Sequence, residues 1–267
     1  MSFKFFLLFE ILLYNMLMII SSQSNQQIKE IKKLKSEKGF LFLDNPKLID
    51  EAIMSGAEVV KIVIEEGKEE KFSHLIQFDF LVASKDVFKS ISSATTSQGA
   101  LAIVKYNQQS FRPPSGNFLV LDEVQDPGNV GTLIRSALAF GFLDVYLINC
   151  ASPTNEKVAR STMGALFKVN VFEIGRDEFI SHFDGKNLIC GVMDGKDITQ
   201  TNFHFPCGVV VGNEGNGVSE KVKDICQKVT IPMNEGVESL NASVAGSILM
   251  FKIKGDTKWA DTVSGTT

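Results

Sequence analysis

The sequence predicts an α/β protein of two domains, and three observations lead to this fold class. Its 267 residues suffice for one large domain or two modest ones. Short runs rich in Val, Ile and Leu alternate with segments of helical periodicity along most of the chain. A polar, proline-containing linker at 107–116 (NQQSFRPPSG) separates two such series. With 44% hydrophobic and 22% charged residues, the composition excludes a disordered chain and a many-span membrane protein.

Residues 1–23 form an apolar N-terminal extension that allows three interpretations. Its charge-free apolar run is shorter than the ~20 residues that a bilayer span needs. A secretory signal would place Lys4 before an apolar stretch, but Glu10 interrupts that stretch. We favour a translation start at Met16 or Met18, because the chain from there onward has the pattern of a complete cytoplasmic protein.

The first domain is predicted at 24–106 and begins with a helix. Ser24 is a plausible N-cap, and an apolar stripe follows at helical spacing. The other face of this helix is the most basic segment of the chain, which is most simply a solvated face; its lysines are Lys29, Lys32, Lys33, Lys35 and Lys38. Further strands are expected at 40–43, 59–64, 78–83 and 100–105, and helices at 46–55 and 85–91.

The second domain is predicted at 117–254, with a polar tail at 255–267 that is expected to fray. Strands are expected at 118–122, 144–148, 169–172, 187–192, 208–212 and 228–231, and helices at 130–140, 155–161, 176–182, 219–226 and 243–252. Apolar strands separated by helices predict a parallel sheet covered on both faces. Ligands of such sheets bind in the loops beyond the carboxyl ends of the strands.

Two of these loops carry unusual residues. The loop after the first strand (DPGNVGTLIR, 126–135) opens a helix with free N–H groups. There Asn129 caps the helix or holds a ligand, and Arg135 follows nearly two turns later. The loop at 209–218 (VVVGNEGNGV) has glycines that let the backbone approach a ligand, and Glu214 projects from it.

A third specialised loop, IPMNEGVESLNASVA (231–245), leads from a short strand into an apolar helix. Three polar residues cluster where that helix begins, Ser239, Asn241 and Ser243, and helix capping explains only one of them.

A nicotinamide-dependent oxidoreductase is a weaker alternative for the function. It requires the motif G-x-G-x-x-G after the first strand, and the turn after that strand lacks this motif.

In this order and spacing, the motifs NVGTLIR, VVVGNEGNG and IPMNEGVESLNASVA resemble those of the SpoU (TrmH-like) family of RNA ribose 2'-O-methyltransferases, in the SPOUT superfamily. The resemblance covers about 118–251. A looser one, opening on IKEIKKL, covers 25–105 and is similar to the small substrate-binding domain that precedes the catalytic domain in rRNA-modifying members. Leu43-Asp44-Asn45 stands where that domain commonly has an acidic-glycine turn.

The resemblance implies a parallel-sheet domain with a deep trefoil knot, which works as a homodimer and binds S-adenosylmethionine. It implies cofactor contacts at the backbone of Gly212, Ile231 and Leu240. It assigns the catalytic site to Asn129, Arg135, Glu214, Ser239 and Asn241. Arginine keeps its proton up to a pKa above ~12, so we expect Arg135 to grip phosphate and to stabilise the developing alkoxide rather than to act as a base.

The expected substrate is RNA, with 23S rRNA favoured over tRNA, and a non-catalytic RNA-binding protein of this fold is the alternative. The net charge of −4 leaves RNA binding to a local basic patch. We assign that patch to Lys29, Lys32, Lys33, Lys35 and Arg112.

No metal is expected, because the histidines and cysteines do not have the spacing of metal ligands. The cysteines are better explained as reduced, structural thiols. These residues are His74, His182, His204, Cys150, Cys190, Cys207 and Cys226.

Overall fold

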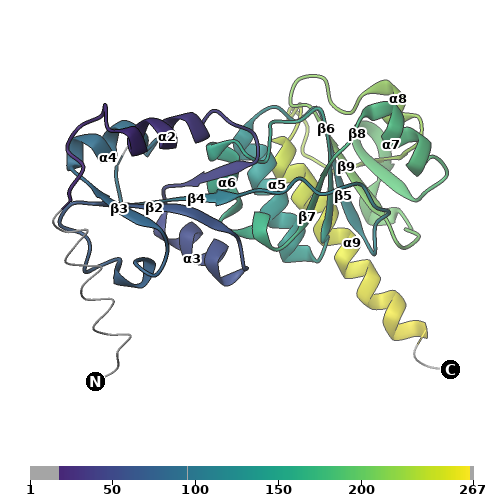
Figure 1. The fold of residues 1–267 in the computed structure, drawn as a ribbon. Helices are drawn as coiled ribbons and strands as arrows, with labels where there is room; N and C mark the ends of the chain where they lie inside the picture. The colour runs from purple at the N-terminus through teal and green to yellow at the C-terminus, as the bar shows by residue number, and fades with distance from the viewer. Residues whose placement is uncertain (1–17, 95, 265–267) are drawn as a thin grey trace. The chain divides into compact units, whose positions relative to one another are not determined.

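The structure is a computed structural model that describes residues 18–94 and 96–264. The chain divides into two compact units, 1–107 and 108–267 (Figure 1). Of the two favoured translation starts, Met16 lies outside the described residues and Met18 is the first residue within them. The described end of the extension runs along an edge of the first sheet, since Ile20 N–H donates to the Val82 carbonyl and Ser84 N–H donates to the Ile20 carbonyl, at 2.9 and 3.0 Å.

In its described residues, the first unit has a four-stranded mixed sheet, three α-helices and one 3-10 helix. Its elements are α2 (Gln26–Leu34), β1 (Phe40–Leu43), α3 (Pro46–Met54), β2 (Val59–Glu65), η1 (Ser73–Leu75), β3 (Phe80–Ala83), α4 (Lys85–Ile91) and β4 (Ala100–Lys105). The strand order is β1-β4-β2-β3, in which only β2 and β3 are parallel. Helices α2 and α4 share one face of the sheet, where their apolar side chains form a single core with those of the strands.

Helix α2 begins one residue later than predicted. Its N-cap is Asn25, whose side chain accepts from Gln27 N–H at 2.9 Å, so the predicted cap at Ser24 is wrong. Both residue types can cap, and the choice follows from Ile28 and Ile31, which are buried and fix the helix phase. The basic face stays in solvent, with Lys29, Lys32 and Lys33 exposed.

The second unit contains a six-stranded, wholly parallel sheet, as the sequence predicts. Its elements are β5 (Phe118–Asp122), α5 (Pro127–Phe140), β6 (Asp144–Ile148), α6 (Glu156–Thr162), η2 (Ala165–Phe167), β7 (Asn170–Glu173), α7 (Arg176–Phe183), β8 (Leu188–Asp197), η3 (Ile198–Gln200), β9 (Gly208–Gly212), α8 (Glu220–Lys223), β10 (Gln227–Thr230) and α9 (Ala242–Ser264). The strand order is β10-β8-β9-β5-β6-β7. The α/β fold class is therefore confirmed, and the trefoil knot stays a prediction.

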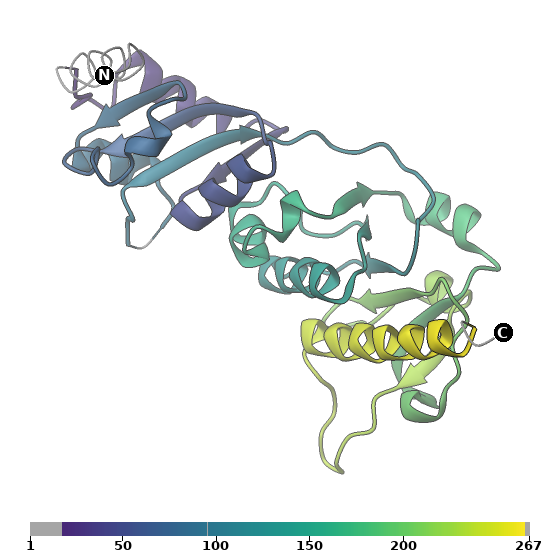
Figure 2. The ribbon, with the colours of Figure 1, turned by 90° about the horizontal axis from the view of Figure 1, so that it is seen from below.

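Alternation along the central strands assigns the helices to two layers. Phe118 and Val120 of β5 face a core that contains Phe179 of α7 and Val222 of α8. On the opposite face, α9 packs beside α5 (Figure 2). A Cβ on Gly246 of α9 would lie less than 3 Å from side-chain atoms of Leu133 and Val211, so this glycine allows the close approach.

Three helices of the second unit have bounds that differ from the sequence prediction by more than one residue. Helix α5 begins at Pro127, not at 130, because Asp126 caps it by accepting from Asn129 N–H at 2.9 Å and proline suits the first helical position. Helix α8 is a single turn rather than the predicted 219–226. Helix α9 crosses Gly255, with an ion pair of 2.8 Å between Lys252 and Asp256 at i,i+4 spacing, so the tail does not fray at 255 but is helical to Ser264.

Strand β8 continues to Asp197, beyond the predicted end at 192, and it bulges. Cys190 pairs with Lys228 of β10, and the next pair is Lys196 with Val229. Residues 191–195 of β8 therefore have no partner in β10 and arch away from the ladder. A Cβ on Gly195 would lie less than 3 Å from the Val229 backbone, so the arch requires glycine at its base.

Candidate active site

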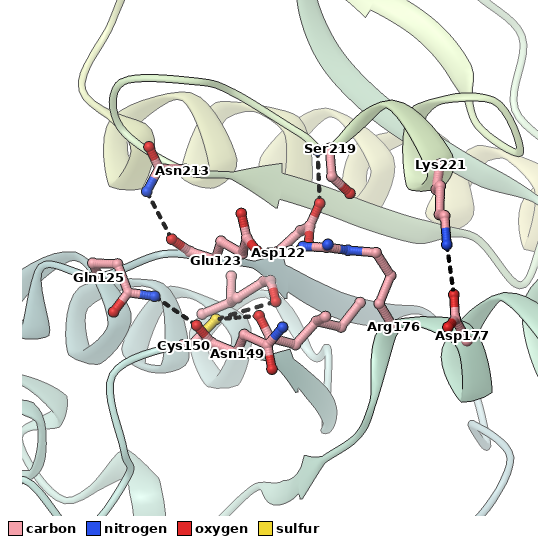
Figure 3. Close-up of polar contacts among 12 residues, drawn as sticks. Asp122, Glu123, Gln125, Asn149, Cys150, Arg176, Asp177, Asn213, Ser219 and Lys221 are labelled. Carbon is pink, nitrogen blue, oxygen red and sulfur yellow. Dashed lines mark hydrogen bonds and ion pairs between the residues drawn. The ribbon is translucent and has the colours of Figure 1, made fainter.

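The carboxyl end of β5 is tied to two other elements through Asp122. Its buried carboxylate accepts from Ser219 N–H at 2.7 Å and from the Arg176 guanidinium at 3.2 Å (Figure 3). Arg176, from the start of α7, also pairs with Glu123 at 2.6 Å. Glu123 adopts φ +60°, a conformation that costs a non-glycine residue on the order of 1 kcal/mol. These contacts hold the turn after β5 against the exit of the loop after β9.

The loop after β9 is a tight hairpin. Asn213 and Gly217 exchange backbone hydrogen bonds of 2.9 Å, and a Cβ on Gly212 would lie less than 3 Å from the backbone of Gly217 and Val218. The Asn213 side chain accepts from Gly215 N–H and donates to the Glu123 carbonyl, both at 2.9 Å. The hairpin is thus closed on itself and bonded to the turn after β5.

A hydrogen-bonded chain joins three of the predicted catalytic residues. Asn129 Nδ2 donates to Glu214 Oε1 at 3.0 Å, and Asn241 Nδ2 donates to Asn129 Oδ1 at 3.1 Å. The Asn241 Oδ1 accepts from Ser243 N–H at 2.9 Å, which makes Asn241 the cap of α9. Asn129 lies in the first turn of α5, which follows β5, while Glu214 and Asn241 lie in the loops after β9 and β10; the parallel sheet brings all three to its carboxyl end.

The network keeps Glu214 ionised. Burial raises the pKa of this carboxyl, but hydrogen bonds from the Asn129 amide and from the backbone N–H groups of Asp126 and Gln125 outweigh burial and lower the pKa below its ordinary value. A carboxyl group whose pKa is lower in the folded protein than in the unfolded chain stabilises the folded state. This stabilisation is complete at pH values above the pKa of the unfolded chain, and it is lost as pH falls through the pKa of the folded protein. Glu214 therefore acts as a fixed acceptor at neutral pH.

A cavity of about 600 Å³ lies beside this network. It is lined by all three predicted cofactor residues, Gly212, Ile231 and Leu240, and by Glu214 and Ser239. Its volume falls within the ~300–1,000 Å³ typical of small-molecule sites. Apolar walls come from β9 and α9, through Val210, Val211, Ala245 and Leu249. Aliphatic walls and closely approaching glycine backbone fit the flat adenine of S-adenosylmethionine.

The remaining site predictions differ in their surroundings. Asn129 and Asn241 do not line the cavity and connect to it through Glu214. Arg135 is exposed on α5, and within the described part of the chain it has no hydrogen bond or ion pair. Arg135 therefore lies on the same helix as Asn129 but, among the described residues, is not bonded to the network.

Three of the predicted RNA-contacting residues have partners within the protein, and Lys33 forms the most exposed of these contacts, an ion pair of 3.5 Å with Glu37. Lys35 Nζ donates to the Ile91 carbonyl at 3.0 Å. Arg112 pairs at 2.6 Å with Asp144, whose side chain is 1% exposed, and its guanidinium lies 5.5 Å from the centre of the Phe172 ring. Because a buried carboxylate needs a partner, Arg112 has a structural role whatever its contact with RNA.

Sequence reasoning missed part of the cavity wall. The arch of β8 contributes residues 191–194, and Glu220, Lys223 and Lys228 complete the charged lining. The glycines that bracket V-M-D in G-V-M-D-G were the available signal, since paired glycines in a strand mark a bulge. In the residues that the structure covers, no group of three His, Cys, Asp or Glu could hold a metal ion, and no helix is long and apolar enough to cross a membrane.

A parallel α/β domain with this cavity and network has the features of a methyltransferase. Residues 116–251 match the sequence model of the SpoU rRNA Methylase family, and the chain belongs to that family. This confirms the predicted enzyme class, an RNA methyltransferase, and the predicted methyl donor, S-adenosylmethionine.

Known proteins resemble the chain over nearly its whole length. It is 26% identical to the 23S rRNA (guanosine(2553)-2'-O)-methyltransferase RlmP of Bacillus subtilis, over 88% of this chain and 99% of RlmP. It is 27% identical to the uncharacterized tRNA/rRNA methyltransferase slr1673 of Synechocystis, over 92% and 96%. The AdoMet-bound rRNA methyltransferase of Sinorhizobium meliloti has the same fold, with a TM-score of 0.77 at 21% identity over 89% of this chain and 97% of that one.

Proposed function

We propose that the chain methylates a ribose 2'-hydroxyl in 23S rRNA. The observation that carries this proposal is the Glu214–Asn129–Asn241 network beside a cavity that fits S-adenosylmethionine. The name of the RlmP relative, which aligns with 88% of the chain, supports 23S rRNA and the 2'-hydroxyl. The intact residues disfavour a non-catalytic RNA-binding protein, and transfer RNA is the alternative substrate.

We assign different roles to the two units. The proposal assigns RNA substrate binding to residues 24–106 and methyl transfer to residues 117–254. Four free thiols among the described residues and an rRNA-modifying relative support a cytoplasmic location.

The protein contributes to this reaction mainly by positioning the cofactor and the target nucleotide. Bound S-adenosylmethionine supplies a methyl group already activated on a sulfonium. The backbone at Gly212, Ile231 and Leu240 would hold that cofactor, while the ionised Glu214 fixes the Asn129 amide and Ser239 reaches the cavity. Because arginine side chains are poor bases, Arg135 is assigned to binding the phosphate of the target nucleotide, and proton removal falls to water or to a phosphate oxygen.

The function is tested by mapping ribose methylation. Ribosomal and transfer RNA from a strain lacking the gene are compared with RNA from strains complemented by the wild type or by Asn129→Asp. We expect one 2'-O-methyl group to be lost from 23S rRNA and to return with the wild type alone. A lost group in tRNA instead would favour the alternative substrate, and unchanged maps of both RNAs would contradict the proposal.

Arg135→Lys separates phosphate binding from base catalysis. Lysine keeps a positive charge but has a pKa of ~10.4, far below that of arginine. If Arg135 binds phosphate, the variant is slower by about 10-fold and its rate follows the wild-type pH profile between about pH 7 and 10. A profile whose rising limb moves to lower pH in the lysine variant would show that this side chain is the base.

The basic face of α2 is the proposed RNA contact of the first unit. Lys29, Lys32 and Lys33 are exposed on one nine-residue helix, and of these three only Lys33 has an acidic partner among the described residues, Glu37 at 3.5 Å. Replacing all three by glutamine is expected to reduce the slope of log affinity against log salt by about 2 to 3, measured by filter binding to an rRNA fragment. An unchanged slope would remove α2 from the interface.

A second copy of this chain is the proposed partner of α9. Val244, Ile248 and Phe251 form a stripe at i, i+4 and i+7 and are 47%, 36% and 67% exposed. Phe140 of α5 extends the patch, with its ring 5.9 Å from that of Phe251. We expect Phe251→Glu to sediment as a monomer and the exposed-site control Lys186→Glu as a dimer; a dimeric Phe251→Glu would exclude this face.

A further inference from the structure

The cofactor cavity has a charged lining that the contacts described above do not explain. Five charged residues line it: Asp194, Glu214, Glu220, Lys223 and Lys228. Glu214 is held by the turn after β5, and Glu220 pairs with Lys223 at 2.6 Å. Asp194 and Lys228 are therefore the lining charges without a hydrogen bond or ion pair among the described residues; Asp194 is attracted by the charge of Lys223, and Lys228 by that of Glu220, but neither is in direct contact.

These two side chains are exposed and of opposite sign. Within the described part of the chain neither has a hydrogen bond or an ion pair. A pair of opposite charges that are not bonded to each other, both facing one cavity, suits a ligand that carries both signs itself.

The β8 arch explains why both charges reach the same cavity. Lys228 stands opposite Cys190 in the ladder, at the point where β8 leaves β10. Asp194 lies near the far end of the arch, just before Gly195 returns β8 to the Val229 backbone. A regular ladder would keep residues 191–194 paired along β10; the arch instead makes all four of them part of the cavity wall.

S-adenosylmethionine has one group with both charges, the amino acid at the end of its methionine chain. We propose that Lys228 and Asp194 bind this group, with Lys228 Nζ donating to the α-carboxylate and the Asp194 carboxylate accepting from the α-ammonium. The apolar walls formed by Val211, Ala245 and Leu249 then serve the adenosine part. This inference rests on the proposed assignment of the cavity to the cofactor.

Ligand truncation tests the inference without measuring activity. S-adenosylhomocysteine carries the amino acid, whereas 5'-methylthioadenosine has the same adenosine and thioether but lacks it. Both are titrated calorimetrically into the full-length wild type, Lys228→Met and Asp194→Asn. The control is Lys221→Met, which removes an exposed lysine that pairs with Asp177 outside the cavity (Figure 3).

Loss of one charge-assisted contact is expected to weaken S-adenosylhomocysteine binding by about 10-fold in each cavity variant. Binding of 5'-methylthioadenosine should stay within about 2-fold of wild type, and Lys221→Met should change neither ligand. Decarboxylated S-adenosylmethionine, which keeps the ammonium but has no carboxylate, separates the two roles: Asp194→Asn should weaken it and Lys228→Met should not.

Two results would overturn the inference. Equal weakening of both ligands would mean that the side chains shape the cavity and do not bind the amino acid. Unchanged affinity for S-adenosylhomocysteine in both variants would leave the amino acid bound elsewhere, with the proposed function intact. If the wild type binds neither ligand, the cavity assignment itself fails, which is a different outcome from either of these.

Discussion

Gly212→Ala is expected to abolish measurable binding of S-adenosylhomocysteine. The added Cβ would lie less than 3 Å from backbone atoms of Gly217 and Val218, which cannot move aside as a flexible side chain can. Relief would require opening the hairpin that Asn213 and Gly217 close with two 2.9 Å hydrogen bonds. Because this hairpin forms part of the cavity wall, we expect at least a ~100-fold loss of affinity by calorimetry, which corresponds to about 3 kcal/mol.

The control for Gly212→Ala is Gly175→Ala, at the N-cap of α7. A Cβ there meets no atom within 4 Å, and its φ of −70° suits any residue. This variant should bind S-adenosylhomocysteine as the wild type does. Should Gly212→Ala also bind normally while remaining folded by circular dichroism, the hairpin would not form the cofactor site.

Asn129→Asp is expected to lower kcat by about 100-fold or more, the loss typical of removing one preorganised polar contact from an active site. The substitution replaces the amide that donates to Glu214 at 3.0 Å with a second carboxylate. Two carboxylates at that distance repel each other, and Glu214 loses its side-chain donor while keeping the backbone N–H groups of Asp126 and Gln125. Affinity for S-adenosylhomocysteine should change by less than about 3-fold, because Asn129 does not line the cavity.

The activity of Asn129→Asp should depend on pH in a direction that the network predicts. Repulsion raises the pKa of one carboxyl of the new pair, and protonation of that group restores a donor between the two side chains. Activity relative to wild type should therefore rise as pH falls. Asn202→Asp, which adds the same charge on an exposed loop, should show neither effect. A fully active Asn129→Asp would contradict the role of the network.

Local sequence patterns predicted the helices and strands well, and the contacts between distant parts of the chain less well. Val- and Leu-rich runs located every strand of the parallel sheet, and three motifs identified the loops that hold Asn129, Glu214 and Asn241. Asp-Pro at 126–127 signals a capped helix start, and overlooking it placed the start of α5 three residues late.

Other features depend on partners far along the chain. Arg176 and Asp122 are 54 residues apart, and Arg112 and Asp144 are 32 apart. Neither ion pair has a local pattern, so sequence reasoning assigned Arg112, which lies within the linker, to RNA binding and missed its contact with Asp144. The glycines at 191 and 195 signal a bulge in β8, but the size of the arch depends on the register of β8 with β10, which the segment 188–197 alone does not specify.

The central claim is that the loops after β5, β9 and β10 form one site for the methyl donor. A crystal structure of the protein grown with S-adenosylhomocysteine tests it most directly. The account predicts ligand density within the cavity, in contact with Gly212, Ile231 and Leu240 and next to the intact Glu214–Asn129 hydrogen bond. Density at another place, or a cavity that stays empty at saturating ligand, would contradict it.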